Sequence, residues 1–340
     1  MAQTDLSLNL AGLSLKNPVM TASGTFGWGL EFGKLVDVSA LGAVVVKATT
    51  LRPRIGNKPP RVTETPAGML NAIGLQNPGV EGVIADKLPY LSRLRVPVIV
   101  NIAGDSVADY AAVAERLAGT GQVAALEINA SCPNCEQGGM LFGLEPASLS
   151  ALVRAVRQAT DLPLITKLSP NVTDIVPLAA AAVAAGSDAL SLINTLVGMA
   201  IDIEKRKPKL GNITGGLSGP AIRPVAVRMV WQVHAAKLGV PIIGMGGIMD
   251  AHDALEFILA GANAVAVGTA HFAAPETPVQ VVAGLAEYCE RHGVARLQDL
   301  VGAAQAFRPD VRADRFAEPA TPGGACDATT QSAESGSAQR

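Results

Sequence analysis

The sequence is poor in aromatic residues, cysteine and net charge. Only 4% of its 340 residues are aromatic, four are cysteine, and the formal net charge is −2. A nearly neutral chain lacks the basic face that a nucleic-acid groove needs, and four cysteines are too few for a disulfide scaffold. No stretch reaches the roughly 18 uninterrupted apolar residues of a membrane span, and the first 20 residues lack a signal-peptide pattern. We therefore expect a cytoplasmic protein that binds neither nucleic acid nor membrane.

Short apolar runs, rich in Val, Ile and Leu, alternate with amphipathic segments along most of the chain. Eight such runs, too short for helices, are typical of parallel strands buried on both faces. They cover residues 18–22, 43–47, 97–101, 123–129, 163–167, 188–194, 241–244 and 264–268. This alternation predicts an α/β fold, a closed (β/α)8 TIM barrel preceded by a β-hairpin over 6–16. A doubly wound open sheet is the rival, but the chain has no early strand–GxGxxG–helix pattern.

Helices are predicted between these runs, and long loops after three of them. The clearest helices are 107–118, 146–159, 174–185, 221–237 and 250–260, with Ser106 and Thr173 as N-caps. The connections 48–80, 130–145 and 195–220 each follow the carboxyl end of a strand, the face where barrels carry chemistry. We expect a catalytic barrel over 1–304 and an extension over 305–340. Residues 317–340 contain no Leu, Ile, Val or aromatic residue, which predicts disorder from about residue 317.

Polar and small residues close the eight runs, and all of them would face one mouth of the barrel. They are Ser23 with Gly24, Lys47, Asn101, Asn129, Lys167, Asn194, Gly246 with Gly247, and Gly268 with Thr269. Amides offer donors and acceptors without charge, which suits a flat heterocycle that displays both C=O and N–H groups. Glycine turns after the last two strands occupy the usual phosphate position of barrels. A phosphate beside a flat polar ring indicates FMN, with Lys167 beside the N1–C2=O edge of the flavin.

The segment ASCPNCEQGG (130–139) is the sharpest local signal. Cys132 lies three residues past Asn129, in a loop where a thiolate can act as nucleophile or general base. Cys132 and Cys135 also form a Cys-x-x-Cys pair, which leaves a metal site or a functional disulfide as alternatives. No second cysteine pair exists to complete a zinc site, so we predict no metal. We expect one catalytic cysteine, and a reversible Cys132–Cys135 disulfide is a further hypothesis.

Four motifs resemble the dihydroorotate dehydrogenase family. They are NASCPNCEQGG, ITKLSPNVTDI, NITGGLSGPAIRPVAVRMV and IIGMGGI, which occur in this order within residues 129–248. The likeness extends over about residues 4–300 and is strongest to the class 1B catalytic subunit. It implies an FMN-containing (β/α)8 barrel that oxidises (S)-dihydroorotate to orotate in pyrimidine biosynthesis. It also implies that Cys132 takes a proton from C5 while hydride passes from C6 to flavin N5.

The resemblance also assigns ligand contacts to positions of this chain. The implied substrate contacts are Lys47, Asn71, Ala72, Ile73, Gly74, Leu75, Asn129, Asn134, Asn194 and Thr195. The implied FMN contacts are Ser23, Lys47, Ala48, Asn101, Asn129, Lys167, Ile193, Gly219, Gly246, Gly247, Gly268 and Thr269, to which the strand-end pattern adds Gly24. Thus the two lines of reasoning select nearly the same strand ends.

The final electron acceptor does not follow from this chain alone. It has no NAD-binding glycine fingerprint and no cluster of four cysteines for an iron–sulfur centre. The class 1B resemblance implies a homodimer of catalytic chains within a heterotetramer, whose second subunit carries FAD and a [2Fe–2S] cluster and passes electrons to NAD⁺. Alternatives are a class 1A homodimer that reduces fumarate, a dihydropyrimidine dehydrogenase-like reductase, and a non-catalytic barrel that binds a phosphate ligand.

Overall fold

The computed structural model describes residues 4–130 and 142–307. The chain divides into two units at Ala306, and the elements below belong to the first. Cys132, Asn134, Cys135 and the extension beyond residue 307 lie outside the described residues, so the predictions made for them stay predictions. In the described ranges, no helix combines the length and the apolar composition that crossing a bilayer requires.

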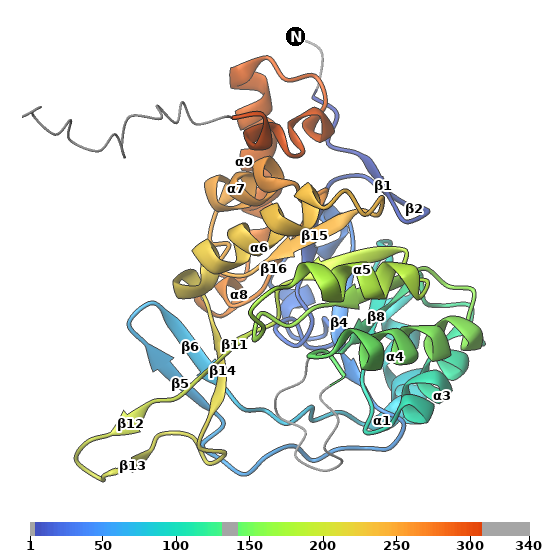
Figure 1. Cartoon of the computed structure of the whole chain (residues 1–340), viewed down its shortest axis with the longest axis vertical. Helices are drawn as coiled ribbons and strands as arrows, with labels where there is room; N and C mark the ends of the chain where they lie inside the picture. The colour runs from blue at the N-terminus through green and yellow to red at the C-terminus, as the bar shows by residue number, and fades with distance from the viewer. Residues whose placement is uncertain (1–3, 131–141, 308–340) are drawn as a thin grey trace, which may run out of the picture. The chain divides into compact units, whose positions relative to one another are not determined.

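Eight parallel strands form the predicted barrel, which confirms the fold class (Figure 1). Their order around the sheet is β3, β16, β15, β10, β9, β8, β7 and β4. They comprise β3 (Val19–Thr21), β4 (Val44–Thr49), β7 (Val98–Ile102), β8 (Ala125–Asn129), β9 (Leu164–Lys167), β10 (Ala189–Leu192), β15 (Ile242–Met245) and β16 (Ala264–Val267). Nearly every residue of these strands is buried, as expected of strands covered on both faces.

A side chain completes the seam between β3 and β4, where the barrel closes. Met20 and Ala43 form a single parallel bridge there. The hydroxyl group of Thr21 accepts a hydrogen bond from the Val45 N–H (2.9 Å) and donates one to the Val45 carbonyl (3.0 Å). Thr21 is fully buried. Its hydroxyl group therefore takes the place of a backbone partner for both polar groups of Val45.

The N-terminal hairpin covers the amino-terminal end of the barrel interior. Strands β1 (Leu8–Leu10) and β2 (Leu13–Leu15) pair in antiparallel register, as the alternating leucines predict. Leu8, Leu10 and Leu15 belong to the same apolar cluster as the inward-facing residues of the barrel strands. The interior is thus an apolar floor at this end, and polar groups are left for the opposite end.

Helices connect most of the strands. They are α1 (Gly79–Gly82) and α2 (Leu88–Leu91), which flank a π-helical segment (Val83–Lys87), then α3 (Val107–Ala118), α4 (Pro146–Ala159), α5 (Val176–Ala184), α6 (Arg223–Ala235), α7 (Ala251–Ala260), α8 (Ala270–Ala273) and α9 (Thr277–His292). Five of these helices, α3 to α7, lie within two residues of the predicted bounds, and the others were not predicted. Residues 22–43, between β3 and β4, form only the 3₁₀ turns Phe32–Lys34 and Val38–Ala40. Further 3₁₀ turns cover Pro220–Ile222, Leu297–Leu300 and Ala303–Ala306.

The two predicted helix N-caps have different outcomes. Ser106 caps α3 in a reciprocal capping box with Asp109. Thr173 does not cap α5, which begins at Val176 after Ile175. The carboxylate of Asp174 accepts a hydrogen bond from the Val176 N–H at 3.0 Å instead. The prediction for Thr173 is therefore wrong, because the longer-reaching carboxylate one residue later satisfies the first turn.

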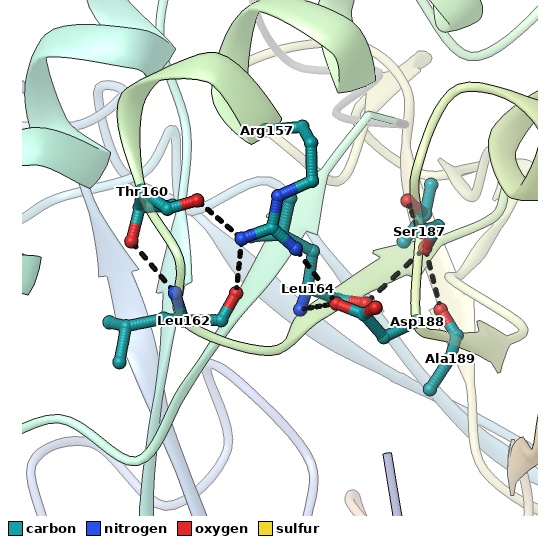
Figure 2. Close-up of polar contacts among 8 residues, drawn as sticks. Arg157, Thr160, Leu162, Leu164, Ser187, Asp188 and Ala189 are labelled. Carbon is teal, nitrogen blue, oxygen red and sulfur yellow. Dashed lines mark hydrogen bonds and ion pairs between the residues drawn. The ribbon is translucent and has the colours of Figure 1, made fainter. Parts of the chain in front are cut away.

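Arg157 ties together the chain segments that lead into β9 and β10 (Figure 2). Its guanidinium group lies 2.9 Å from the carboxylate of Asp188, and it donates to the carbonyl groups of Thr160 and Leu162. Asp188 also accepts from the Leu164 N–H at 2.8 Å. One arginine of α4 thus fixes the amino-terminal ends of two adjacent strands, at the end of the barrel away from the polar strand ends.

A separate antiparallel sheet is built from the long connections that follow β4 and β10. Its order is β11 (Leu196–Gly198), β14 (Gly215–Ser218), β6 (Gly68–Asn71) and β5 (Val62–Thr65). A two-stranded ribbon, β12 (Ile201–Asp202) with β13 (Lys207–Pro208), lies beyond it (Figure 1). Because β14 pairs with β6, residues 216–218 come into register with 69–71. The two connections are therefore one structural unit beside the barrel mouth.

Candidate functional site

Alternation along the barrel strands places the charged strand ends inside the mouth. Val45 and Ile165 belong to the apolar cluster of the interior. Lys47 and Lys167 come two residues later on the same strands, so their side chains leave the strands on the same face. Asn101 stands in the same relation to Ile99. The floor is therefore apolar, and the layer above it is polar.

The predicted site residues that the structure describes line one cavity, with one exception. The residues are Ser23, Gly24, Lys47, Ala48, Asn71, Ile73, Gly74, Leu75, Asn101, Asn129, Lys167, Ile193, Asn194, Thr195, Gly219, Gly246, Gly247, Gly268 and Thr269. The exception is Ala72, which is fully buried and whose N–H donates to the carbonyl of Arg61. Ala72 thus holds the loop that carries its neighbours.

The amide side chains of the mouth are ordered by hydrogen bonds among themselves and with the backbone. Asn194 donates to Oδ1 of Asn129 at 3.3 Å and accepts from the Thr195 N–H at 2.8 Å. Asn71 donates to the carbonyl of Gly216 across the antiparallel sheet at 3.4 Å. The phenol of Tyr110 supports the Asn129 carbonyl from behind, at 2.7 Å. These contacts preorganise polar groups that can bind a heterocycle.

Two lysines give the cavity positive charge. Lys167 is almost fully buried, and its ammonium group donates to the hydroxyl group of Ser23 at 3.1 Å. Burial, and then the positive charge of Arg61, lower the pKa of Lys47, while Glu31 opposes this shift. Burial disfavours the charged form of a lysine because it removes water from the ammonium group. An anionic ligand beside Lys47 would restore part of that lost stabilisation.

Three glycines form a tight cradle at one side of the cavity. Gly219, Gly246 and Gly247 all have positive φ angles, of 99°, 127° and 78°. A Cβ atom on Gly247 would lie 2.7 Å from the carbonyl oxygen of Gly219. Next to the cradle, the hydroxyl group of Thr269 donates to that of Ser218 at 2.8 Å. Backbone that is bare of side chains can bring its N–H groups close to a phosphate.

Sequence reasoning missed several residues of this site. The cavity is also lined by Ala22, Thr25, Val62, Met69, Ser218, Ile222, Met245, Ala266 and Phe272. Val62 and Met69 come from the β5–β6 hairpin, whose pairing with β14 has no local sequence signal. Glu127 was missed as well, although a signal existed. Glu127 lies two residues before Asn129, the polar end of the run VAALEIN, so alternation along a strand places both side chains on the face toward the barrel interior.

The fold and the cavity define the class of protein: a (β/α)8 barrel with a polar cavity at the carboxyl ends of its strands, where barrels of this class carry their sites. The chain belongs to the dihydroorotate dehydrogenase family, whose sequence pattern matches residues 5–289.

Curated relatives support this membership over most of the chain. The chain is 60% identical over 301 residues to the catalytic subunit of dihydroorotate dehydrogenase B (NAD⁺) from Pelobacter propionicus, covering 88% of this chain and 99% of that protein. It is 61% identical over 295 residues to the subunit of the same name from Desulforudis audaxviator, covering 87% and 96%. The crystal structure of a dihydroorotate dehydrogenase from Eimeria tenella in complex with ferulenol superposes with a TM-score of 0.75. That pair is 26% identical, and the match covers 88% of this chain and 89% of that one.

Membership of this family implies FMN as the cofactor, and the cavity fits that group. The glycine cradle provides bare backbone for a phosphate, since a Cβ on Gly247 would collide with Gly219. Oδ1 of Asn101 is buried and has no hydrogen-bond partner among the residues that the structure describes, and a ring N–H would supply one. The ammonium group of Lys167 stands where a carbonyl or an anionic nitrogen can be stabilised.

Proposed function

We propose that this chain is the catalytic subunit of an NAD⁺-linked dihydroorotate dehydrogenase, which oxidises (S)-dihydroorotate to orotate in pyrimidine biosynthesis. The observation that supports the proposal best is the gathering of amides, lysines and bare glycine backbone in one cavity. This occurs in a chain whose curated relatives of that name are 53–61% identical to it. Dihydroorotate carries an imide and a carboxylate, which match amide and ammonium partners respectively.

The substrate would lie among Lys47, Asn71, Asn129, Asn194 and Thr195, on the loop that also presents Ile73, Gly74 and Leu75. The amides of Asn129 and Asn194 already hold each other at 3.3 Å, so they would bind the ring with little reorganisation. Lys47 would pair with the carboxylate, and the charge of that carboxylate would raise the lysine pKa that burial has lowered.

Cys132 would take the proton from C5 of dihydroorotate. Bound FMN would supply the acceptor for the hydride that leaves C6. Loss of both hydrogens forms the C5–C6 double bond of orotate, and the proton stays on the Cys132 sulfur until solvent removes it. Ser23, Ala48, Asn101, Lys167 and Ile193 would hold the flavin ring, and Gly219, Gly246, Gly247, Gly268 and Thr269 its phosphate.

Electrons would leave through a second subunit, since this sequence has no iron–sulfur or dinucleotide motif. We propose a cytoplasmic heterotetramer built on a homodimer of this chain. Its partner is an iron–sulfur flavoprotein with FAD and a [2Fe–2S] cluster that delivers electrons to NAD⁺.

The test begins with purification of the chain together with its co-isolating proteins. We expect a yellow complex that oxidises dihydroorotate with NAD⁺, and whose flavin dihydroorotate reduces faster than dihydrouracil does. Turnover with fumarate but not with NAD⁺ would contradict the class 1B assignment. Colourless protein that does not take up added FMN would contradict the whole proposal.

Two cysteine variants test which residue accepts the proton. Cys132→Ala should abolish dihydroorotate oxidation near neutral pH and leave FMN bound. Cys289→Ala is the matched control, because Cys289 is buried in α9 and burial raises the pKa of its thiol. That variant should retain turnover. Undiminished turnover in Cys132→Ala would remove the base assignment.

A further inference from the structure

A buried carboxylate lies beneath the cavity and has no part in the proposed chemistry. Glu127, on β8, is 1% exposed. Its Oε1 accepts a hydrogen bond from Nδ2 of Asn101 at 2.6 Å, and its Oε2 accepts one from the hydroxyl group of Ser191 at 2.9 Å. Within residues 4–130 and 142–307, no basic side chain forms an ion pair with it. A buried charge without a cation is expensive, so its hydrogen bonds matter.

The chemistry of Glu127 fixes the orientation of the Asn101 amide. The two residues are register partners on the neighbouring strands β8 and β7. A carboxylate can only accept hydrogen bonds, so the atom of Asn101 that faces it must be the amide nitrogen. Oδ1 is then the atom left over. It is buried, has no hydrogen-bond partner within residues 4–130 and 142–307, and belongs to a residue that lines the cavity.

We propose that Glu127 is a positioning residue, which turns the Asn101 amide so that Oδ1 accepts a hydrogen bond from an N–H group of the ligand. The ligand is FMN if the proposed function holds, and the inference rests on that function in this respect. Oxidised flavin has a single ring N–H group, N3–H, between two carbonyl groups. A reversed amide would bring N–H toward N–H at this point and would leave both donors unpaired.

Exchanging the carboxylate of Glu127 and the amide of Asn101 between the two positions tests the orientation of the amide separately from the charge of the carboxylate. In Glu127→Gln the partner of Asn101 can donate or accept, so the Asn101 amide is no longer fixed. We expect the dissociation constant of FMN, measured by fluorescence titration of apoprotein, to rise about tenfold, with a shift of the flavin absorption bands. Asn101→Asp opposes two carboxylates and should weaken binding at least as much.

The double variant Glu127→Gln/Asn101→Asp should recover FMN affinity to within about threefold of the wild type. The introduced glutamine donates to the introduced aspartate, which again offers the ligand an acceptor. Ser191→Ala is the matched control. It removes the second hydrogen bond of Glu127 from a residue that is not among those lining the cavity, and its affinity should stay within about threefold of the wild type.

Folded variants, checked by circular dichroism, give a clear decision. The inference is overturned if the double variant binds FMN no better than Glu127→Gln alone. If the double variant does not fold, Glu127→Gln decides: wild-type affinity with an unchanged flavin spectrum overturns the inference. Failure of the wild-type apoprotein to bind FMN would instead count against the proposed function.

Discussion

Lys167 and Ser23 meet across the barrel mouth, where the ammonium group donates to the hydroxyl group over 3.1 Å. Lys167 ends β9 and Ser23 follows β3, and three other strands separate these two in the sheet order. The long side chain therefore crosses the interior and brings its ammonium group to a nearly buried position at the mouth. Fixed charges in such a position stabilise developing negative charge more strongly than charges in water do.

Lys167→Met keeps the length of the side chain and removes its charge. We expect dihydroorotate to reduce the bound flavin about 10- to 100-fold more slowly, because the negative charge that develops on the flavin loses its partner. Stopped-flow absorbance measures this rate. Lys237→Met, at the exposed turn before β15, is the control and should behave as wild type. Equal rates in the two variants would refute the role given to Lys167.

Gly247→Ala should close the glycine cradle. The added methyl group would lie 2.7 Å from the carbonyl oxygen of Gly219, and the φ angle of 78° is also unfavourable for alanine. We expect the dissociation constant of FMN to rise at least tenfold. Gly239→Ala is a close control, because φ is 81° there and nothing lies within 4 Å of the added carbon. The Gly239→Ala variant introduces backbone strain without a steric collision, so its dissociation constant for FMN should equal that of the wild type.

Thr21→Val should weaken the seam of the barrel. Valine has nearly the shape of threonine but cannot bond to the N–H and carbonyl groups of Val45, which Thr21 satisfies at 2.9 and 3.0 Å. Leaving these buried groups unpaired should lower the free energy of unfolding by about 2 kcal/mol, measured by urea denaturation. Thr21→Ser keeps the hydroxyl group and should lose less. A larger loss of unfolding free energy in Thr21→Ser than in Thr21→Val would refute this role of the hydroxyl group.

His271 should make the stability of the protein fall in acid. Burial lowers the pKa of His271 to about 4 from 6.5, although its bond to the Gly268 carbonyl opposes this. The unfolded chain therefore binds the proton first, and stability falls as pH decreases from about 6.5 toward 4. We expect a loss of roughly 2 kcal/mol in the free energy of unfolding between pH 7.5 and pH 5 from this residue.

The variant His271→Phe measures that contribution by difference. The ring of His271 lies 5.3 Å from that of Phe26 and 5.5 Å from that of Phe32, so phenylalanine suits its surroundings. Denaturation at several pH values should show a flatter profile in the variant than in the wild type. Parallel profiles would mean that other groups cause the acid sensitivity.

The strand ends of the site could be predicted from sequence because two local rules determine them. Short apolar runs mark buried parallel strands, and alternation decides which residue faces inward, as with Lys47 two places after Val45. The same rule, applied to VAALEIN, would have revealed Glu127. Taken as an apolar run that ends in a polar residue, VAALEIN predicts a functional role for Asn129 alone.

The antiparallel sheet could not be predicted in the same way. Residues 62–71 and 215–218 are far apart in the sequence, and their pairing depends on three-dimensional proximity rather than on local pattern. The motif NITGGLSGPAIRP favours a hairpin-like flap, and β11 does pair with β14. Strand β14 also pairs with β6 on its other side, and this second pairing brings Met69 and Ser218 into register. Thus the barrel was predictable, whereas the arrangement of its long connections was not.

The leucine hairpin and the apolar strand residues fill one end of the barrel, while the lysines and amides that line the cavity stand at the other. Folding and ligand recognition therefore draw on different portions of the same eight strands. Such a division suits redesign. Side chains at the mouth can be substituted to bind a new substrate, while the apolar core that drives hydrophobic collapse stays unchanged. Glu127 and Ser191 lie at the boundary between the polar mouth and the apolar end. Substitutions on the apolar side of this boundary should lower the free energy of unfolding.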